Sequence, residues 1–259
     1  TGGKIIGVRW VDVNKGDNDN PEIRCRITAK EFNDIKRDDL SAATPPLEAK
    51  KMIFSFAVTE GIGYQKGQKN EGMKIDFIDV RRAYYHAKAM REVYVALPPG
   101  DEEEGMCGLL LKSLQGTRDA AQNWEREYQE MAASLGFTKG VASPCTFYHA
   151  DRDLRMVVHG DDFTCLGTDA SLDKWEKAMA ENFEVKLKGR IGHEDKDLKE
   201  MRVLNRIIHV VPRGLAYEAD PRHVELLVKS LGLEDCKKVG TPGVKLTAEE
   251  VFDEPDQTP

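Results

Sequence analysis

The chain has 259 residues, of which 40% are hydrophobic and 32% are charged. This length is enough for one large domain or two small ones with a buried core. The formal net charge of -7 argues against a general polyanion-binding protein, since nucleic-acid contact usually requires a basic surface. Much of the negative charge lies in residues 101–104 and 245–259, so the rest of the chain is close to neutral and nucleic-acid binding is not excluded.

No segment predicts membrane insertion or secretion. The apolar stretches are far shorter than the roughly 20 residues that cross a bilayer, and no signal peptide is visible. The five cysteines are widely spaced, odd in number and free of C-x-x-C pairs, which argues against a disulfide framework and favours a reducing compartment. The chain opens on Thr1 instead of Met, so we expect it to be part of a longer protein.

Several common site motifs are absent from the sequence. The six histidines form no H-x-x-x-H pair, which argues against a zinc-protease helix. The G-x-G-x-x-G loop, the P-loop and the G-x-S-x-G nucleophile elbow do not occur either. These absences lower the expectation of a dinucleotide-binding protein, an NTPase or an α/β-hydrolase.

The start of the chain predicts a basic β-hairpin. Residues 5–13 and 23–28 have the composition of strands and are joined by a polar turn at residues 14–21. The second strand and the residues just beyond it carry three cations, Arg24, Arg26 and Lys30.

Apolar residues at helical spacing predict four helices. The first should place residues 49, 52, 53, 56 and 57 on its inward face. The four helices are predicted to run from just after Pro46 to Glu60, from Asp119 or Asn123 to Gly136, from a cap at Ser171 to Phe183, and from a cap at Asp220-Pro221 to Gly232.

Strands are predicted between these helices, with a loop at residues 66–72 and a frayed end at residues 253–259. The predicted strands cover residues 74–80, 92–97, 146–149, 154–159, 163–166 and 203–211. Helices and strands do not alternate strictly, which favours the α+β class over a doubly wound sheet.

Three carboxylates stand out from this pattern. Asp79 ends an apolar strand and shares a face with Ile75 and Phe77 by the two-residue period. Asp161 and Asp162 lie at a sharp turn between two apolar strands. Taken separately, such residues are usually a strand cap and an ordinary turn. Acids that meet from two strands would repel each other unless a divalent cation lay between them, and oxygen-only ligands suit Mg²⁺.

The segments around these acids resemble a known family. Residues 77–85, FIDVRRAYY, resemble the first catalytic motif of reverse transcriptases, in the version found in copia-type LTR retrotransposons. Residues 158–162, VHGDD, resemble the second motif, the aspartate-pair hairpin. Other segments resemble copia segments in the same order, at residues 10–32, 92–100, 111–124 and 226–242. The resemblance covers nearly the whole chain and is much more specific than one motif.

The resemblance implies a right-hand polymerase fold, with an antiparallel palm sheet flanked by helices, fingers and a partial thumb. It implies one reverse transcriptase domain over residues 1–259. Within it, the resemblance implies fingers at residues 1–72 and 98–118, a palm at residues 73–97 and 119–212, and the start of a thumb or connection with a disordered acidic tail at residues 213–259.

The resemblance also implies an RNA- and DNA-templated DNA polymerase that transfers dNTPs to a primer 3′-OH with two Mg²⁺ ions. Asp79 and Asp161 would hold the metal ions, Asp162 would assist, and the backbone carbonyl of Val80 would complete one metal site. Mn²⁺ is expected to substitute. Tyr84 would be the aromatic residue that leaves no room for a ribose 2′-OH.

Further substrate contacts are expected from two other segments. Arg24, Arg26 and Lys30 are candidates to contact the triphosphate or the template, although alone they would be a solvated strand face. Gln115 and Gly116 would border the nucleotide pocket, with Arg118 nearby. Trp124 is expected to be a core residue, because it lies in the apolar stripe of its helix.

Departures from the family pattern support a second hypothesis. His159-Gly160 stands where copia enzymes usually have Tyr-Val, and glycine is expected to loosen the turn. Asp119 is expected to bring negative charge towards the triphosphate, and Ala121 replaces a common proline. The alternative is a decayed or domesticated, catalytically weak remnant that acts as a nucleic-acid-binding or interaction module. A metal-dependent phosphohydrolase is a third hypothesis, without a motif of its own.

The expected partners are an RNA template, a DNA primer or duplex, and dNTPs, with no membrane. Integrase and RNase H would lie outside this chain, on the rest of a polyprotein. The family suggests cytoplasmic virus-like particles with a nuclear stage, and the sequence makes no prediction of an oligomeric state.

Overall fold

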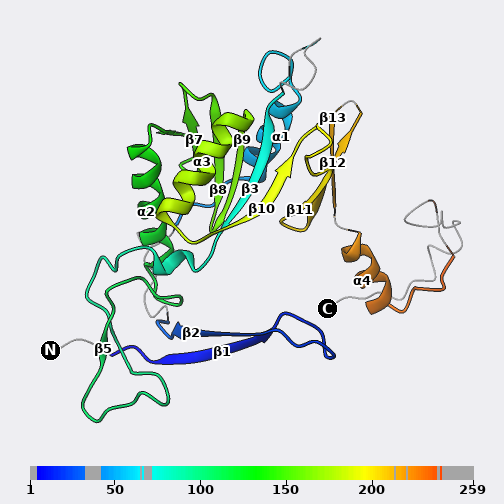
Figure 1. Cartoon of the computed structure of the whole chain (residues 1–259). Helices are drawn as coiled ribbons and strands as arrows, with labels where there is room; N and C mark the ends of the chain where they lie inside the picture. The colour runs from blue at the N-terminus through cyan, green and yellow to red at the C-terminus, as the bar shows by residue number, and fades with distance from the viewer. Residues whose placement is uncertain are drawn as a thin grey trace, which may run out of the picture.

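The computed structural model of the chain describes residues 5–32, 42–64, 66, 72–212, 214–219, 221–237 and 240. Its centre is a six-stranded antiparallel sheet with the strand order β10-β3-β9-β8-β7-β6 (Figure 1). The strands are β3 (Lys74–Val80), β6 (Thr138–Lys139), β7 (Thr146–His149), β8 (Leu154–His159), β9 (Asp162–Gly167) and β10 (Val185–Ile191).

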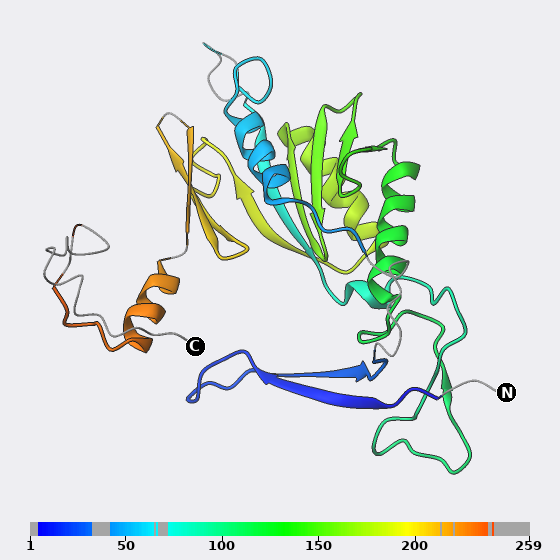
Figure 2. The same cartoon turned by 180° about the vertical axis from the view of Figure 1, so that it is seen from behind.

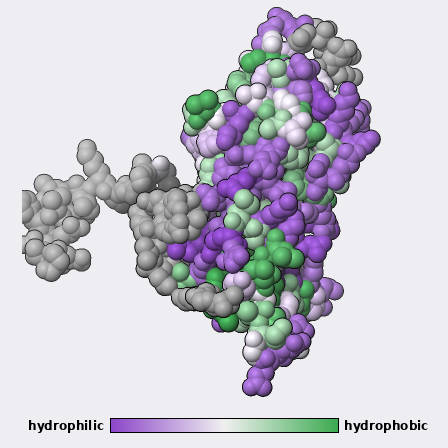
Figure 3. Space-filling view, turned by 90° about the vertical axis from the view of Figure 1, so that its left-hand side faces the viewer, coloured by the Kyte–Doolittle hydropathy of each residue, from purple (hydrophilic) through white to green (hydrophobic). Residues whose placement is uncertain are grey.

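Helices cover both faces of this sheet. Figure 1 shows α2 (Ala120–Ser134) and α3 (Asp169–Asn182) on one face and α1 (Leu47–Ala57) on the other. The face under α2 and α3 is rich in aromatic residues, and Trp124 and Trp175 are almost completely buried there. The left-hand side of Figure 1 is mainly hydrophilic at its surface, with scattered hydrophobic patches (Figure 3). This layering buries the apolar stripes of the helices and leaves their polar faces in solvent.

Strand β3 is buried on both faces, and its alternating side chains decide where the acids lie. Ile75 and Phe77 pack in the core under α1, whereas Ile78 and Val80 pack in the core under α2 and α3. Because side chains alternate along a strand, Asp79 continues the α1 face at the end of β3. This confirms the face predicted from the sequence.

A hairpin of β1 (Val8–Asn14) and β2 (Ile23–Ala29) forms a separate layer beyond one end of the sheet (Figures 1 and 2). The end of β3 lies on the side of the sheet that faces this hairpin. A small core joins the hairpin to β4 (Tyr94–Val95) and β5 (Gly108–Leu109). This core contains Ile6, Ala29, Val93, Val95 and Leu114.

The C-terminal part contains a three-stranded sheet of β11 (Glu200–Val203), β12 (Arg206–Val211) and β13 (Gly214–Ala219), followed by α4 (Arg222–Ser230). Ile208 of β12 is fully buried in the core under α1, which anchors this sheet to the body. Helix α4 buries none of its residues, and Val224, Leu226, Leu227 and Leu231 are each more than 60% exposed.

The fold confirms the predicted α+β class with an antiparallel sheet flanked by helices, while the right-hand arrangement stays a prediction. Four local predictions were wrong. Residues 203–211 form a hairpin, because Leu204 and Asn205 turn with positive φ. Helix α3 is capped by Thr168 and not by Ser171, and the predicted strand at 92–97 is only Tyr94–Val95.

The fourth wrong prediction concerns α1, whose buried residues are Ala49, Lys50, Ile53 and Phe54. Met52 is 42% exposed, so the helix is rotated relative to the predicted face. The helix ends at Ala57 and not at Glu60. The predictions for Asp220, most of the loop at 66–72 and the frayed end at 253–259 lie outside the described residues.

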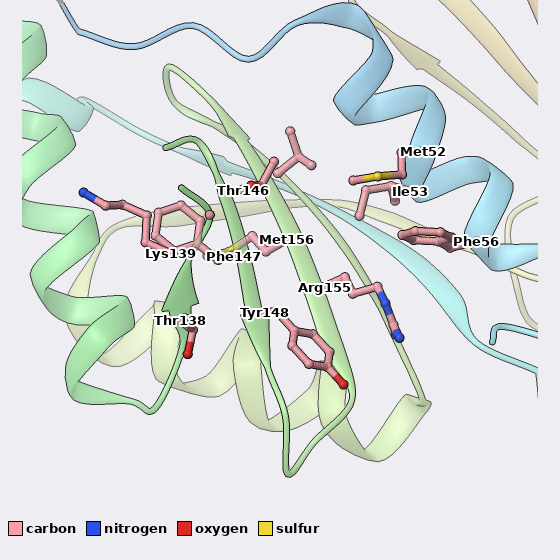
Figure 4. A pocket seen from close by; sticks show the side chains of 12 residues that line it. Met52, Ile53, Phe56, Thr138, Lys139, Thr146, Phe147, Tyr148, Arg155 and Met156 are labelled. Carbon is pink, nitrogen blue, oxygen red and sulfur yellow. The ribbon is translucent and has the colours of Figure 1, made fainter. Parts of the chain in front are cut away.

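A pocket of about 560 Å³ lies between α1 and strands β6, β7 and β8 (Figure 4). Arg155 lies over the rings of Phe56 and Tyr148, at 5.6 and 5.1 Å from their centroids. None of the described residues that line this pocket is one of the three predicted metal ligands.

Among the described helices, none has the length and apolar character needed to cross a bilayer.

Candidate active site

The two acidic motifs meet on neighbouring strands. Asp79 of β3 and Asp162 of β9 are direct cross-strand partners. One residue further along, the backbone N–H of Val80 donates to the carbonyl of Asp161 at 2.9 Å. Directly opposed residues in an antiparallel pair share one face of the sheet. Asp79 and Asp162 therefore share one face, and Asp161 lies beside them in the turn.

The β8–β9 turn that carries Asp161 has two central residues, Gly160 and Asp161, because His159 and Asp162 are the last cross-strand pair. Gly160 has φ of 64°, a conformation that glycine adopts without the cost of a Cβ. The indole Nε1 of Trp124 donates to the Gly160 carbonyl at 2.9 Å. The turn geometry therefore suits glycine and α2 contacts the turn, while the expectation that glycine loosens it stays a prediction.

Lys188 on β10 makes the closest charge contacts in the site. Its Nζ lies 3.2 Å from Asp79 Oδ2 and 2.5 Å from Asp162 Oδ1. The register between β10 and β3 shifts between Leu187 and Gly189, which leaves Lys188 as the extra residue of a β-bulge. Bulges turn a side chain out of the regular alternation, and they are common beside active sites. This bulge places the ammonium group across the two carboxylates.

A second lysine lies buried behind the acids. Lys50 of α1 is only 2% exposed, and its Nζ has no hydrogen-bond partner. Burial lowers the pKa of Lys50, while the charge of Asp162 acts in the opposite direction. Burial and the charge of Lys50 together lower the pKa of His159. The helix that covers this face of the sheet therefore adds a cation to the site.

The three carboxylates affect one another electrostatically. Burial raises the pKa of Asp161, and the charges of Asp162 and Asp79 raise it further. A divalent cation would relieve this repulsion, and carboxylate oxygens are the ligands that Mg²⁺ prefers. The structure shows one cationic group in contact with both Asp79 and Asp162, so these two carboxylates are placed to share one cation. Among the described residues, no group of three or more His, Cys, Asp and Glu side chains is arranged to hold a metal ion.

Tyr84 lies close enough to Asp161 for the charge of that acid to act on it. The chain turns sharply after β3 at Arg82, which has φ of 54° and pairs with Glu184, and a short 3-10 helix, η2 (Ala83–Tyr85), follows. Tyr84 is half-buried against the core under α2. Burial raises the pKa of Tyr84, and the charge of Asp161 adds to this rise.

Gln115 and Gly116 are far from the three acids in the sequence, and they lie against the end of β2 in the basic hairpin. The N–H of Ala29 donates to the Gln115 carbonyl at 2.8 Å, and that of Glu31 donates to the Gly116 carbonyl at 3.4 Å. Gly116 has φ of 90°, and a Cβ there would lie 2.1 Å from the Ala29 carbonyl oxygen. Glycine is therefore required where the two segments meet.

Asp119 does not project free negative charge into the site. Its carboxylate accepts hydrogen bonds from Arg91 and Asn123, both at 2.9 Å, and the residue is 5% exposed. Burial would raise the pKa of Asp119, but the hydrogen bonds from Arg91 and Asn123 outweigh it and lower that pKa. Arg91 also pairs with Glu31, which accepts from the backbone N–H of Arg118. Asp119 is therefore ion-paired, and its effect on a triphosphate stays a prediction.

The structure does not bring all predicted substrate residues to the acids. Arg24 and Arg26 lie opposite Val13 and Val11 on one face of the hairpin, and Lys30 is exposed at its end. Of these three cations, Arg26 acts on Tyr85 of η2: burial raises the pKa of Tyr85, and the charge of Arg26 opposes this rise. The hydroxyl of Tyr85 lies 3.5 Å from the Ile27 carbonyl and links the two groups of residues.

Sequence reasoning missed Lys188 and Lys50. Lys50 had a visible signal, because it lies one position after Ala49 and three before Ile53 in an apolar helix face. Lysine is almost never fully buried unless its charge is paired, so a lysine at such a position is notable. Lys188 had no such signal, since its direction depends on a bulge whose register is set by pairing with β3.

Comparisons with known proteins bear on the family of this chain. A model of the family "Reverse transcriptase (RNA-dependent DNA polymerase)" matches residues 1–194. The Retrovirus-related Pol polyprotein from transposon TNT 1-94 of Nicotiana tabacum is 22% identical over 258 residues, which covers 93% of this chain. The chain spans 18% of the length of that polyprotein. The chain therefore belongs to the reverse transcriptase family, as a copia-type retrotransposon member.

Proposed function

We propose that the chain is the polymerase core of a copia-type retrotransposon polyprotein, which adds dNTPs to a primer 3′-OH on an RNA or DNA template. One observation carries this proposal. The two motif acids lie on directly paired strands, and the Val80 N–H bonds to the Asp161 carbonyl. Polymerase chemistry requires carboxylates from two strands that share hard cations.

Each acid has a role in this proposal. Asp79 and Asp161 would hold two Mg²⁺ ions, for which Mn²⁺ can substitute, while Asp162 assists and the Val80 carbonyl completes one site. Bound Mg²⁺ supplies activation of the primer hydroxyl and stabilisation of the leaving pyrophosphate. The three acids would hold those ions, and the partial burial of Asp79 and Asp162 would limit the water around them.

The neighbouring residues would select and bind the nucleotide. Tyr84, beside Asp161, would pack under the sugar and exclude a ribose 2′-OH. Gln115, Gly116 and Arg118 would border the nucleotide, and the cations of the hairpin would contact the triphosphate or the template. These assignments divide the chain into fingers, palm and the start of a thumb, at the boundaries expected from the sequence.

A decayed or domesticated remnant that binds nucleic acid is the second candidate. The ion pairs of Lys188 favour it, because an ammonium group occupies the space between two metal ligands. Two other arguments for a remnant are weaker, since Asp119 is neutralised by Arg91 and Gly160 suits its turn.

The context of a polyprotein sets the proposed partners. RNA template, DNA primer and dNTPs would bind this chain, and integrase and RNase H would belong to other parts of the polyprotein. Cytoplasmic virus-like particles with a nuclear stage are the proposed location.

The test is primer extension with the purified chain. A labelled DNA primer on an RNA template is incubated with four dNTPs and Mg²⁺ or Mn²⁺. Elongation that requires the metal and the template supports the polymerase. If nucleic acid binds but is not elongated with either metal, the remnant is the correct description.

A further inference from the structure

The carboxylates of the site already share a cationic group of the protein itself. Lys188 Nζ contacts Asp79 Oδ2 at 3.2 Å and Asp162 Oδ1 at 2.5 Å. The three side chains are between 24% and 34% exposed, so water screens these contacts only in part. The ammonium group therefore compensates the repulsion between two acids that directly face each other across β3 and β9.

The backbone is built to hold Lys188 in this place. The extra residue of the bulge is Lys188, and Gly189 after it pairs with Phe77, which lies on the same face as Asp79. Gly189 has φ of 141°, and a Cβ there would lie 2.2 Å from Leu198 Cδ1. A side chain at residue 189 would have to push the end of the Leu198 side chain aside, and the positive φ favours glycine, so the backbone of the bulge suits Gly189.

The buried Lys50 limits how much positive charge the site can accept. Lys50 is close enough to Asp162 and Lys188 for their charges to act on it. Three carboxylates and two ammonium groups already come close to neutrality. A divalent cation that entered while both lysines stayed would leave an excess of positive charge in a partly buried space.

We propose that Lys188 is a tethered counter-ion that holds Asp79 and Asp162 in place before metal binding and leaves them when a divalent cation binds. Lys188 thereby sets the metal affinity of the site. This inference rests on the proposed function, because it takes the acids to be the metal ligands. It concerns the protein before and during the binding of a divalent cation. Lys188 acts in it as a positioning residue.

The test measures metal binding without nucleotide or nucleic acid. Mn²⁺ is titrated into the full chain, and the free Mn²⁺ is measured by electron paramagnetic resonance. Lys188→Met should bind Mn²⁺ about tenfold or more tightly than wild type, because a competing charge has been removed from two ligands. Lys188→Arg, which keeps the charge, should bind as wild type does.

Lys186→Met is the matched control. Lys186 lies on the same strand, directly opposite Asp79, and loses the same charge. Its substitution should change Mn²⁺ affinity by no more than about twofold, as expected for an exposed charge. Equal gains in Lys186→Met and Lys188→Met would reduce the effect to net charge and overturn the inference. Unchanged affinity in Lys188→Met would overturn it as well.

A second measurement uses the wild-type chain and does not depend on the folding of a variant. Acetic anhydride modifies lysines at a rate that follows the availability of the free amine, and mass spectrometry reads the rate at each residue. Saturating Mg²⁺ should raise the modification of Lys188 several-fold relative to Lys186. No rise at Lys188 would contradict its displacement.

These readouts separate the inference from the proposed function. If the chain elongates no primer but its Lys188→Met variant gains Mn²⁺ affinity, the counter-ion role of Lys188 is supported and the polymerase function is refuted. If the chain elongates primers but neither Mn²⁺ affinity nor Lys188 modification changes, the polymerase function is supported and the counter-ion role of Lys188 is refuted.

Discussion

Asp79 and Asp162 are direct cross-strand partners, although they lie 83 positions apart in the chain. An antiparallel register puts the side chains of such partners on one face at the closest spacing that a sheet allows. A pair of acids in this position destabilises the sheet unless a cation accompanies it. The structure supplies Lys188, and the proposed chemistry supplies metal ions.

We expect Tyr84→Val to increase incorporation of ribonucleotides. The ring lies close enough to Asp161 for its charge to act on the hydroxyl, and in the proposed function its removal would open space for a 2′-hydroxyl under the sugar. The measurement compares incorporation of each dNTP with that of the matching ribonucleotide. Tyr85→Val is the control, because Tyr85 follows on the same turn but directs its hydroxyl to Ile27 of β2. Equal sugar discrimination in Tyr84→Val and wild type would remove Tyr84 from this role.

We expect Trp124→Phe to destabilise the chain and slow extension. The substitution removes the indole N–H that bonds to the Gly160 carbonyl at 2.9 Å, which leaves a partly buried acceptor unpaired. Such a loss costs about 1–3 kcal/mol of unfolding free energy. Urea unfolding measures this cost. Trp10→Phe, at a tryptophan that is 49% exposed, should change stability by less than about 0.5 kcal/mol.

Local sequence patterns predicted most of the central sheet and the helices that cover it. The helix stripe through Trp124 and Tyr128 and the apolar strand before Asp79 were both confirmed, because burial on a fixed face leaves a period in the sequence. Strand β10 was missed, since KLKGR contains three cations and a glycine and has no apolar alternation. Its position at the sheet edge comes from pairing with β3 and not from local propensity.

We expect Arg91→Met to destabilise the chain by about 2 kcal/mol. The substitution leaves the buried Asp119 carboxylate without its cation, and the partial exposure of Arg91 moderates the cost. Chemical denaturation of Arg91→Met, Asp119→Asn and the double variant measures the coupling. The double variant should lose less stability than the sum of the single changes. Strict additivity would show that the pair is not coupled.

Asp119→Asn also tests whether this acid acts on the nucleotide. Because Arg91 and Asn123 already engage the carboxylate, its neutralisation should leave the KM for dNTPs unchanged. A clear fall in this KM would show that Asp119 repels the triphosphate after all.

We expect the contribution of Asp169 to stability to disappear in acid. Burial would raise the pKa of Asp169, but hydrogen bonds from Lys74 and Arg190 outweigh it and lower that pKa to about 2. A folded pKa below the ordinary value stabilises the fold above about pH 4, and this contribution is lost as the pH falls towards 2.

The measurement is the difference in Tm between wild type and Asp169→Asn from pH 7 to pH 2. The variant should be less stable by about 1 kcal/mol at pH 7, and the difference should shrink below pH 4. Asp151→Asn, in the exposed turn before β8, should show no such dependence. A difference between wild type and Asp169→Asn that stays constant with pH would contradict the assignment.

The candidate site was only partly predictable, because the acids lie in recognisable motifs whereas the lysines around them do not. Asp79, Asp161 and Tyr84 belong to short motifs whose spacing is visible in the sequence. Lys188 contacts the acids through a bulge, and the rotation of α1 buries Lys50 within reach of their charge. Both depend on packing between segments far apart in the chain. The same dependence paired Asp119 with Arg91, a partner that no local pattern indicated.

Single-turnover primer extension by Asp79→Asn and Asp161→Asn tests the central claim most directly. Each change removes one ligand charge while keeping the size of the side chain. Extension with Mg²⁺ should be lost in both variants and kept in Asp151→Asn, with all three chains folded as judged by circular dichroism. Extension at the wild-type rate in either Asp79→Asn or Asp161→Asn would contradict catalysis through these paired acids.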